Sequence, residues 1–127
     1  MSSDIVWQTI RNNSAFLKTR RNVPKRFSTE RFNLMAVNSQ RYNGLVNRKG
    51  VHIQLSKDGK KVDVLTKIAK NEHLPQKSTR TVSILSKNCR RARNGVASLV
   101  KTYKKRDIMP AQRFISQLLR GTPKAKK

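Results

Sequence analysis

The amino-acid sequence predicts an α+β fold: a small antiparallel sheet with a short N-terminal helix and two C-terminal basic helices. Around a central Asp-Gly pair, residues 51–66 alternate between apolar and polar side chains, as the two strands of a hairpin do. Residues 92–119 carry apolar side chains at helical spacing in two successive runs. Because 127 residues suit one domain, we expect a single domain over residues 1–121 and a disordered basic tail over 122–127.

The first element predicted is a short helix that begins near Ser3 and Asp4, two residue types that cap helix N-termini. The apolar side chains at positions 6, 7 and 10 share one face of such a helix. The polar run Arg11-Asn12-Asn13 is expected to end it.

The pattern is weaker between this helix and the hairpin. Residues 14–20 indicate a strand in which Phe16 and Leu17 are buried. Residues 20–31 are basic, contain Pro24 and have no clear period, so we expect a loop that Phe27 and Phe32 anchor to the body. Residues 33–38 indicate a second short strand.

The hairpin over residues 51–66 is the strongest local signal. Asp58-Gly59 favours a two-residue type I′ turn, in which both residues have positive φ. That turn fixes a register in which Ile53 faces Val64 and apolar residues pair on one face of the sheet. Leu65, opposite His52, is the misfit on the polar face. Residues 79–85 are rich in β-branched side chains and predict one more strand.

Two helices are predicted in the last third of the chain. The first is capped by Ser86 or Asn88, and its apolar stripe comprises Ala92, Val96, Leu99, Val100 and Tyr103. In the second, Asp107 is expected to be the cap, Pro110 is tolerated in the first turn, and Gly121 with Pro123 ends the helix. The apolar stripe of the second helix comprises Ala111, Phe114, Ile115, Leu118 and Leu119.

The charge of the chain predicts a polyanionic partner. It has 30 Lys and Arg against 6 Asp and Glu, a net charge of +24. Such a charge opposes compaction unless it is neutralised. Nucleic acid is the first candidate, ahead of an anionic membrane or an acidic chaperone. The net charge is +5 over residues 1–40, +7 over 41–86 and +12 over 87–127, so the folded body itself is expected to bind the partner.

Other classes of protein fit the sequence poorly. The single cysteine, Cys89, excludes an intrachain disulfide framework. The two histidines, His52 and His73, lack metal-ligand spacing, the acids are scattered, and no phosphate-binding glycine loop is present. We therefore expect no enzyme, no cofactor and no small-molecule substrate. No uncharged stretch is long enough to span a membrane and no secretory signal is visible, although residues 1–26 have a composition like that of a mitochondrial presequence.

One loop suits RNA with unstacked bases. Arg41-Tyr42-Asn43-Gly44 combines a guanidinium, an aromatic ring, an amide and a flexible glycine. Arginine and aromatic side chains stack on unpaired bases, whereas lysine and arginine contact phosphates without reading the sequence. The alternative is that Tyr42 is a core residue beside a turn.

At this loop the sequence resembles a known family. Asn33-Leu34, the run Asn38-Ser39-Gln40-Arg41-Tyr42-Asn43-Gly44-Leu45 and Arg48-Lys49 are similar to the signature of eukaryotic large-subunit ribosomal protein twenty-eight. Trp7, Arg11-Asn12 and Phe16-Leu17 match its N-terminal pattern, and the resemblance covers nearly the whole chain. Gln40 and Asn47 depart from that pattern, which usually has an aromatic residue and a histidine there, and the C-terminal tail is short.

The resemblance implies a structural constituent of the cytosolic 60S subunit that binds large-subunit rRNA and lies beside other ribosomal proteins, with assembly in the nucleolus. It implies no catalysis. The alternative is a nucleolar pre-60S assembly factor that shares the domain; a DNA-compacting protein or an imported organellar protein is a third reading. With rRNA as the partner, the expected contacts are Arg11, Arg20, Arg21, Arg26, Arg41, Tyr42, Asn43, Arg48, Lys49, Arg90, Arg91, Arg93, Lys101, Lys104, Lys105 and Arg106.

Overall fold

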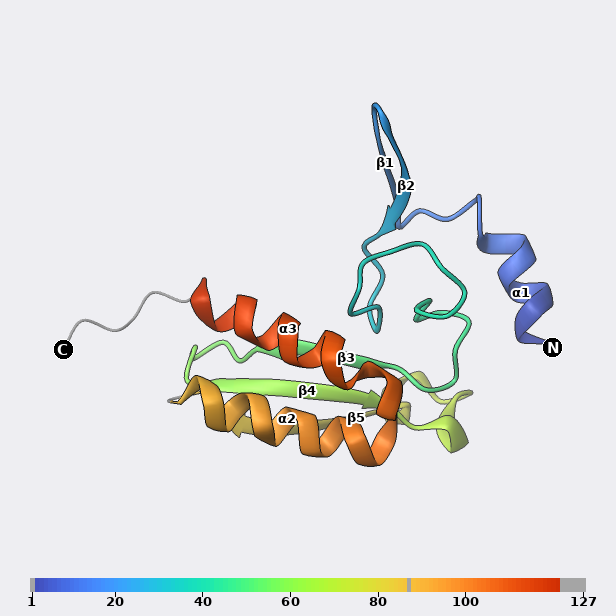
Figure 1. Ribbon diagram of the computed structural model, residues 1–127. Coiled ribbons are helices and arrows are strands. Elements are labelled where there is room, and N and C mark those ends of the chain that lie inside the picture. The colour runs from blue at the N-terminus through green and yellow to red at the C-terminus, as the bar shows by residue number, and fades with distance from the viewer. Residues whose placement is uncertain (1, 87, 122–127) are drawn as a thin grey trace.

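A three-stranded antiparallel sheet with two helices on one face forms the body of the protein in the computed structural model, which describes residues 2–86 and 88–121 (Figure 1). The strands follow one another in the order β3-β4-β5, and α2 and α3 lie side by side against them. Their bounds are β3 Val51–Leu55, β4 Lys61–Lys67, β5 Thr79–Leu85, α2 Cys89–Tyr103 and α3 Ile108–Arg120. The predicted α+β architecture is therefore confirmed, while the predicted tail lies outside the described residues.

The N-terminal third forms a separate layer beside this body. Helix α1 (Ser3–Ile10) is followed by a two-stranded ribbon, β1 (Leu17–Arg20) and β2 (Val23–Ser28), which projects away from the rest of the molecule (Figure 1). Short 3-10 helices at Ala69–Asn71, Pro75–Lys77 and Lys105–Asp107 complete the connections.

The predicted register of the central hairpin is confirmed, although the predicted turn is wrong. Ile53 pairs with Val64 and Leu55 with Val62. The amide of Gly59 donates to the carbonyl of Ser56 at 2.9 Å, and Gly59 has a φ of 66°, but Asp58 does not have a positive φ. A type I′ turn is therefore absent. The amide of Ser56 donates to the carbonyl of Lys61 at 3.0 Å, so residues 57–60 form a four-residue loop between the strands. This loop adds one residue on each side of the Asp58-Gly59 pair, and the register therefore stays the same.

The apolar residues predicted to face inward form the core. Val51, Ile53, Val62 and Val64 of the sheet pack against Ala92, Val96 and Val100 of α2 and Ala111 and Ile115 of α3. These side chains are at most 1% exposed. On the other face of the sheet Leu65 is also buried, and its pairing partner His52 lies edge-on to the ring of Phe32, 6.0 Å between centroids. The loop that carries Phe32 thus covers Leu65 and His52 on the face of the sheet that was predicted to be polar.

The three helices differ in whether a side chain bonds to the free backbone amides at their N-termini. The side chain of Asn88 accepts hydrogen bonds from the amides of Arg90 and Arg91, which confirms one of the two predicted caps of α2. Asp107 is at the N-cap of α3 but makes no side-chain cap bond, because its carboxylate pairs with Lys104 instead. Helix α1 begins after Ser2, also without a side-chain cap bond, so neither Ser3 nor Asp4 has the predicted role.

Three predictions for residues 14–38 are wrong. Residues 23–28 form β2 rather than a loop: Pro24 is tolerated because this ribbon has free edges and a register shift lies opposite it. Residues 33–38 make one isolated bridge and no strand, since Ala36 has a φ of 52°. Phe16, predicted to be buried, lies outside β1 and is 42% exposed.

Candidate nucleic-acid interface

The Arg41–Leu45 loop is held in shape by two of its own residues. Asn43 is buried, and its side-chain oxygen accepts hydrogen bonds from the amides of Leu45 at 2.9 Å and Val46 at 2.8 Å. A Cβ on Gly44 would lie 2.0 Å from the carbonyl oxygen of Arg31, so no larger residue fits. Asn43 and Gly44 therefore hold the loop in shape, and the side-chain oxygen of Asn43 is bonded to the backbone of the loop itself.

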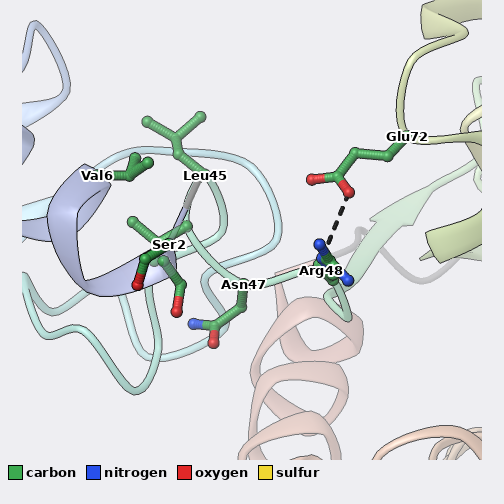
Figure 2. A pocket seen from close by; sticks show the side chains of 8 residues that line it. Ser2, Val6, Leu45, Asn47, Arg48 and Glu72 are labelled. Carbon is green, nitrogen blue, oxygen red and sulfur yellow. Dashed lines mark ion pairs between the residues drawn. The ribbon is translucent and has the colours of Figure 1, made fainter.

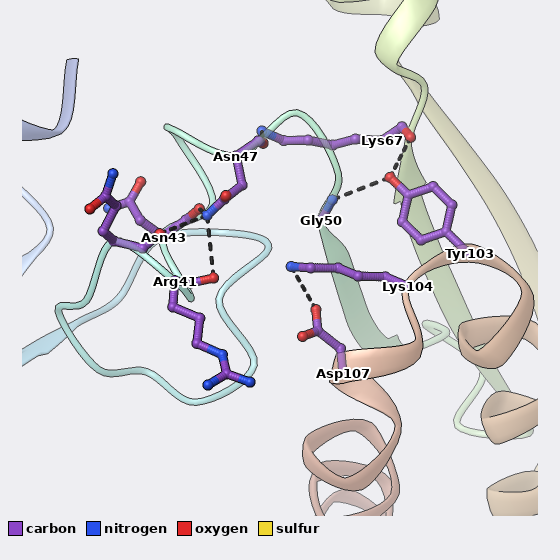
Figure 3. A network of polar contacts seen from close by, with 9 residues as sticks. Arg41, Asn43, Asn47, Gly50, Lys67, Tyr103, Lys104 and Asp107 are labelled. Atoms are coloured by element: carbon purple, nitrogen blue, oxygen red, sulfur yellow. Dashed lines mark hydrogen bonds and ion pairs between the residues drawn. The ribbon is translucent and has the colours of Figure 1, made fainter. Parts of the chain in front are cut away.

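A polar network joins this loop to the end of the sheet and to the last turn of α2 (Figure 3). The side-chain amide of Asn47 donates to the carbonyls of Gln40 and Asn43, both at 2.8 Å. The ammonium of Lys67 donates to the carbonyls of Gly44 and, at 3.1 Å, Asn47. With the carbonyl of Arg41, which accepts from Asn47 at 3.4 Å, five carbonyl groups converge on two nitrogen donors.

Tyr103 closes this network on the side of α2. Its hydroxyl donates to the carbonyl of Lys67 at 2.6 Å and accepts from the amide of Gly50 at 3.2 Å. Burial raises the pKa of the Tyr103 phenol and lowers the pKa of the Lys67 ammonium, since each charged form is the one that burial penalises. Both side chains therefore bond to backbone groups within the fold.

The remaining candidates of this loop face solvent. Arg41 is exposed, and its guanidinium lies 5.6 Å from the ring centroid of the half-buried Tyr42. The ammonium of the exposed Lys49 lies 5.9 Å from the ring centroid of Tyr103. Arg48 is exposed but pairs loosely with Glu72 at 3.6 Å. The structure therefore brings Arg41, Tyr42, Arg48 and Lys49 to one end of the body.

Four further candidates belong to the projecting ribbon and the segment at its base. Arg20 and Arg21 lie at the tip, where Asn22 takes a φ of 63° in the tight turn between the strands. Arg26 lies on β2 and donates to the side chain of Asn12 at 2.6 Å, while Arg11 caps the C-terminal end of α1. All four arginines are exposed, and residues 17–28 contain no acid.

The candidates of the C-terminal helices form two separate groups. Arg90, Arg91 and Arg93 are exposed on the first turns of α2, whereas Lys101, Lys105 and Arg106 are exposed at or beyond its other end, roughly 15 Å away at 1.5 Å per residue. Lys104 is different: its side chain is 11% exposed and pairs with the buried Asp107 at 2.8 Å. Like Asn43, it is occupied within the fold.

The described surface carries little negative charge to balance these cations. Ion pairs within residues 2–86 and 88–121 are limited to Arg48–Glu72 and Lys104–Asp107. In this part of the chain, no group of three His, Cys, Asp or Glu side chains lies close enough to hold a metal ion. None of the described helices combines the length and apolar character that crossing a membrane requires.

A wide cleft separates α1 from residues 45–48 of the loop. It has a volume of about 750 Å³, and Figure 2 shows Val6 and Leu45 on one side of it and the Arg48–Glu72 pair on the other. Neither histidine lines it. The cleft therefore offers a wide, mixed surface without a constellation of reactive groups.

Sequence reasoning did not find Lys67 or Asn47, which hold the loop together. Lys67 ends a strand, and nothing in its spacing indicates burial. Asn47 gave a better signal, because it lies four residues after Asn43 in a segment with few apolar residues.

Comparisons with known proteins match most of the chain. The family model described as the Ribosomal L28e protein family matches residues 5–121. The large ribosomal subunit protein eL28 of Caenorhabditis elegans is 48% identical over 83 residues, which are 65% of this chain and 64% of that protein. Proteins of the same name from Dictyostelium discoideum and Schizosaccharomyces pombe are 35% identical over 103 residues and 31% identical over 101 residues. These matches cover 81% and 79% of this chain, and 75% of each of those two proteins.

Proposed function

The chain belongs to the Ribosomal L28e protein family, and from this premise we propose that it is a structural constituent of the cytosolic large ribosomal subunit that binds large-subunit rRNA. The relatives carry the name of a large-subunit protein, and the family model spans nearly the whole described fold. The family is structural rather than enzymatic, so the function is to bind and stabilise RNA beside neighbouring ribosomal proteins.

The observation that carries this proposal is a basic surface that the protein does not neutralise by itself. With a net charge of +24 and two ion pairs within the described residues, nearly all arginine and lysine heads face solvent. Phosphates of RNA supply the missing counter-charge, and the release of their counterions favours binding. The ribbon β1–β2 extends the same kind of surface away from the body (Figure 1).

The contacts we propose follow from which side chains are free. Phosphate contacts come from the exposed cations of the ribbon, of α2 and of the loop, while Arg41 and Tyr42 together offer a guanidinium and a ring to an unstacked base. Asn43 and Lys104 are left out of this set, because the first bonds to the loop backbone and the second to Asp107.

Sedimentation of tagged protein from eukaryotic cells tests the assignment to the mature subunit. We expect one copy for each mature 60S particle and polysome, retained at moderate salt and released at high salt. The alternative, a nucleolar assembly factor, predicts protein on precursor particles and none on mature ones. Finding the protein only in free fractions would contradict both.

Substitution of the ribbon tests the RNA contact itself. The variant R20Q/R21Q/K25Q removes three exposed charges that make no ion pair or hydrogen bond with other described residues. K70Q/K77Q/R80Q removes three exposed charges elsewhere and is the matched control. We expect the ribbon variant to bind purified large-subunit rRNA at least about tenfold more weakly at 0.15 M salt, with the control close to wild type. Equal affinities for the two variants would contradict a role of the ribbon.

A further inference from the structure

A second basic feature lies on the outer side of the helix pair, away from the Arg41–Leu45 loop. A groove of about 320 Å³ is lined by residues of both C-terminal helices, namely Arg93, Met109, Gln112, Arg113, Ser116, Gln117 and Arg120. Two of its three arginines, Arg113 and Arg120, were not among the candidates that the sequence suggested.

The helical periods of α2 and α3 explain why these residues meet. On α3, positions 109, 113, 116 and 120 follow the spacing of one helix face, and this face is opposite the buried side chains of Ala111 and Ile115. Arg93 follows directly after the buried Ala92 near the start of α2. The two helices run antiparallel (Figure 1), and Arg93 lines the groove together with residues of α3. The fold of the core therefore fixes the groove.

The three guanidinium groups have no partner within the described chain. All three arginines are exposed, and none makes an ion pair or a side-chain hydrogen bond with another described residue. The dipole of α3 stabilises the positive charge of Arg120 in its last turn, but it does not explain the charges of Arg113 and Arg93. Three like charges around one groove repel one another, so the arrangement is most stable when an anion occupies it.

We propose that this groove binds the sugar-phosphate backbone of an RNA strand, a proposal that rests on the rRNA-binding function above. Guanidinium groups donate paired hydrogen bonds to phosphate oxygens. Arg113 and Arg120 are two helical turns apart, roughly 10 Å, and so contact different phosphates. The side-chain amides of Gln112 and Gln117 line the groove and make no hydrogen bond with other described residues, so they can bond to ribose hydroxyls of the same strand.

The salt dependence of RNA binding tests this proposal. The variant R93Q/R113Q/R120Q is compared with wild type and with K70Q/K77Q/R80Q, which removes the same charge far from the groove. Loss of three phosphate contacts makes the plot of log affinity against log salt shallower by about 2 to 3. The control is expected to change it by less than about 1. The charge-preserving variant R93K/R113K/R120K retains the slope and binds more weakly, because lysine lacks the planar fork.

A photo-crosslinker at position 117 in assembled large subunits identifies the occupant directly. A crosslink from Gln117→benzoylphenylalanine to rRNA supports the proposal, and a crosslink only to a ribosomal protein overturns it. Equal salt slopes for R93Q/R113Q/R120Q and the control also overturn it, provided that wild type binds rRNA. Failure of wild type to bind rRNA or to enter large subunits contradicts the proposed function instead. Circular dichroism spectra and thermal melts confirm that each variant is folded.

Discussion

At Gly44 the Arg41–Leu45 loop passes close to the backbone of Arg31. A Cβ at this position would lie 2.0 Å from the carbonyl oxygen of Arg31 and 3.0 Å from Cβ of Phe32. Backbone atoms cannot rotate away as a side chain can. We expect Gly44→Ala to lower the free energy of unfolding by about 1–3 kcal/mol, the usual cost of overpacking, as measured by urea denaturation.

Gly95→Ala is the matched control for this prediction. Gly95 lies within α2, and its added methyl group would meet side-chain carbons of Ile84 at 3.5 Å, an ordinary contact. Alanine is the better helix former, so this variant is expected to gain about 0.5–1 kcal/mol. Equal losses at both glycines would show that the close approach at Gly44 is unimportant.

The pair Lys104–Asp107 is another residue-scale determinant of stability. Both side chains are nearly buried, 11% and 9% exposed, so the removal of one charge leaves the other buried without a partner. Asp107→Ala is expected to cost about 3–5 kcal/mol in urea denaturation, whereas the double variant K104M/D107L regains most of this loss. If the single variant does not fold, the double variant still tests the pair, because it is expected to fold and to bind rRNA like wild type. Weak RNA binding by a folded double variant would contradict the structural role.

His52 gives the fold a dependence on pH. Burial lowers the pKa of its imidazole below the ordinary value of 6.5, and the nearby Arg31 lowers it further. The unfolded chain therefore binds the proton more readily than the folded protein, so the free energy of unfolding falls as the pH drops below about 6.5. We expect His52→Gln to flatten this dependence between pH 7.5 and about 5.5. An unchanged slope in His52→Gln would contradict the assignment.

At the residue scale, the types of residue indicate which side chains are important. They do not show whether a side chain binds a partner or stabilises the fold. Arg41-Tyr42-Asn43-Gly44 was recognised from its residue types, yet two of the four serve the loop itself because their partners are backbone groups. Such partners are set by how the chain folds back on itself, as when Arg31 meets Gly44. Charge alone likewise did not separate the paired Lys104 from its exposed neighbour Lys105.

At the element scale, the ribbon β1–β2 is the part of the fold with least support from the protein. Ser28 is its one buried residue, and a two-stranded ribbon without an apolar face is marginally stable in water. Amide hydrogen exchange is expected to be fast over residues 17–28 of the free protein and slower when rRNA is bound. The amides of β4, which lies between two strands, are expected to be protected in both states and are the internal control. Unchanged exchange in the ribbon would contradict its contact with RNA.

The elements were predicted correctly where two independent signals agreed. The alternation of β3 and β4 and the position of the turn gave the same register, so the register survived a wrong turn type. Helices α2 and α3 combine a long apolar stripe with a clear start or stop. The ribbon was missed because Pro24 argues against a strand, and its pairing, like the positive φ of Ala36, depends on contacts that local sequence does not encode.

At the scale of the whole molecule, the core and the charge act against each other. The sheet and the two helices bury a small set of valine, isoleucine and alanine side chains, while the surface carries most of the charge of +24. Since the acids form few ion pairs within the described residues, the positive charges repel one another over the whole surface. Only salt ions or a polyanionic partner can reduce this repulsion.

Opposite effects of salt on folding and on RNA binding follow from this balance. Raising sodium chloride from about 0.01 to about 0.1 M shortens the screening length from about 30 to about 10 Å, so repulsion within the free protein weakens. The melting temperature of the free protein is therefore expected to rise, by on the order of 4 °C for each kcal/mol gained. Over the same range its affinity for rRNA is expected to fall, because the release of each counterion into a more concentrated salt solution is less favourable. At the lowest salt, added rRNA should raise the melting temperature as salt does, since the phosphates supply the same relief. A melting temperature that stays constant or falls as salt is added would show that charge repulsion does not limit the stability of the free protein.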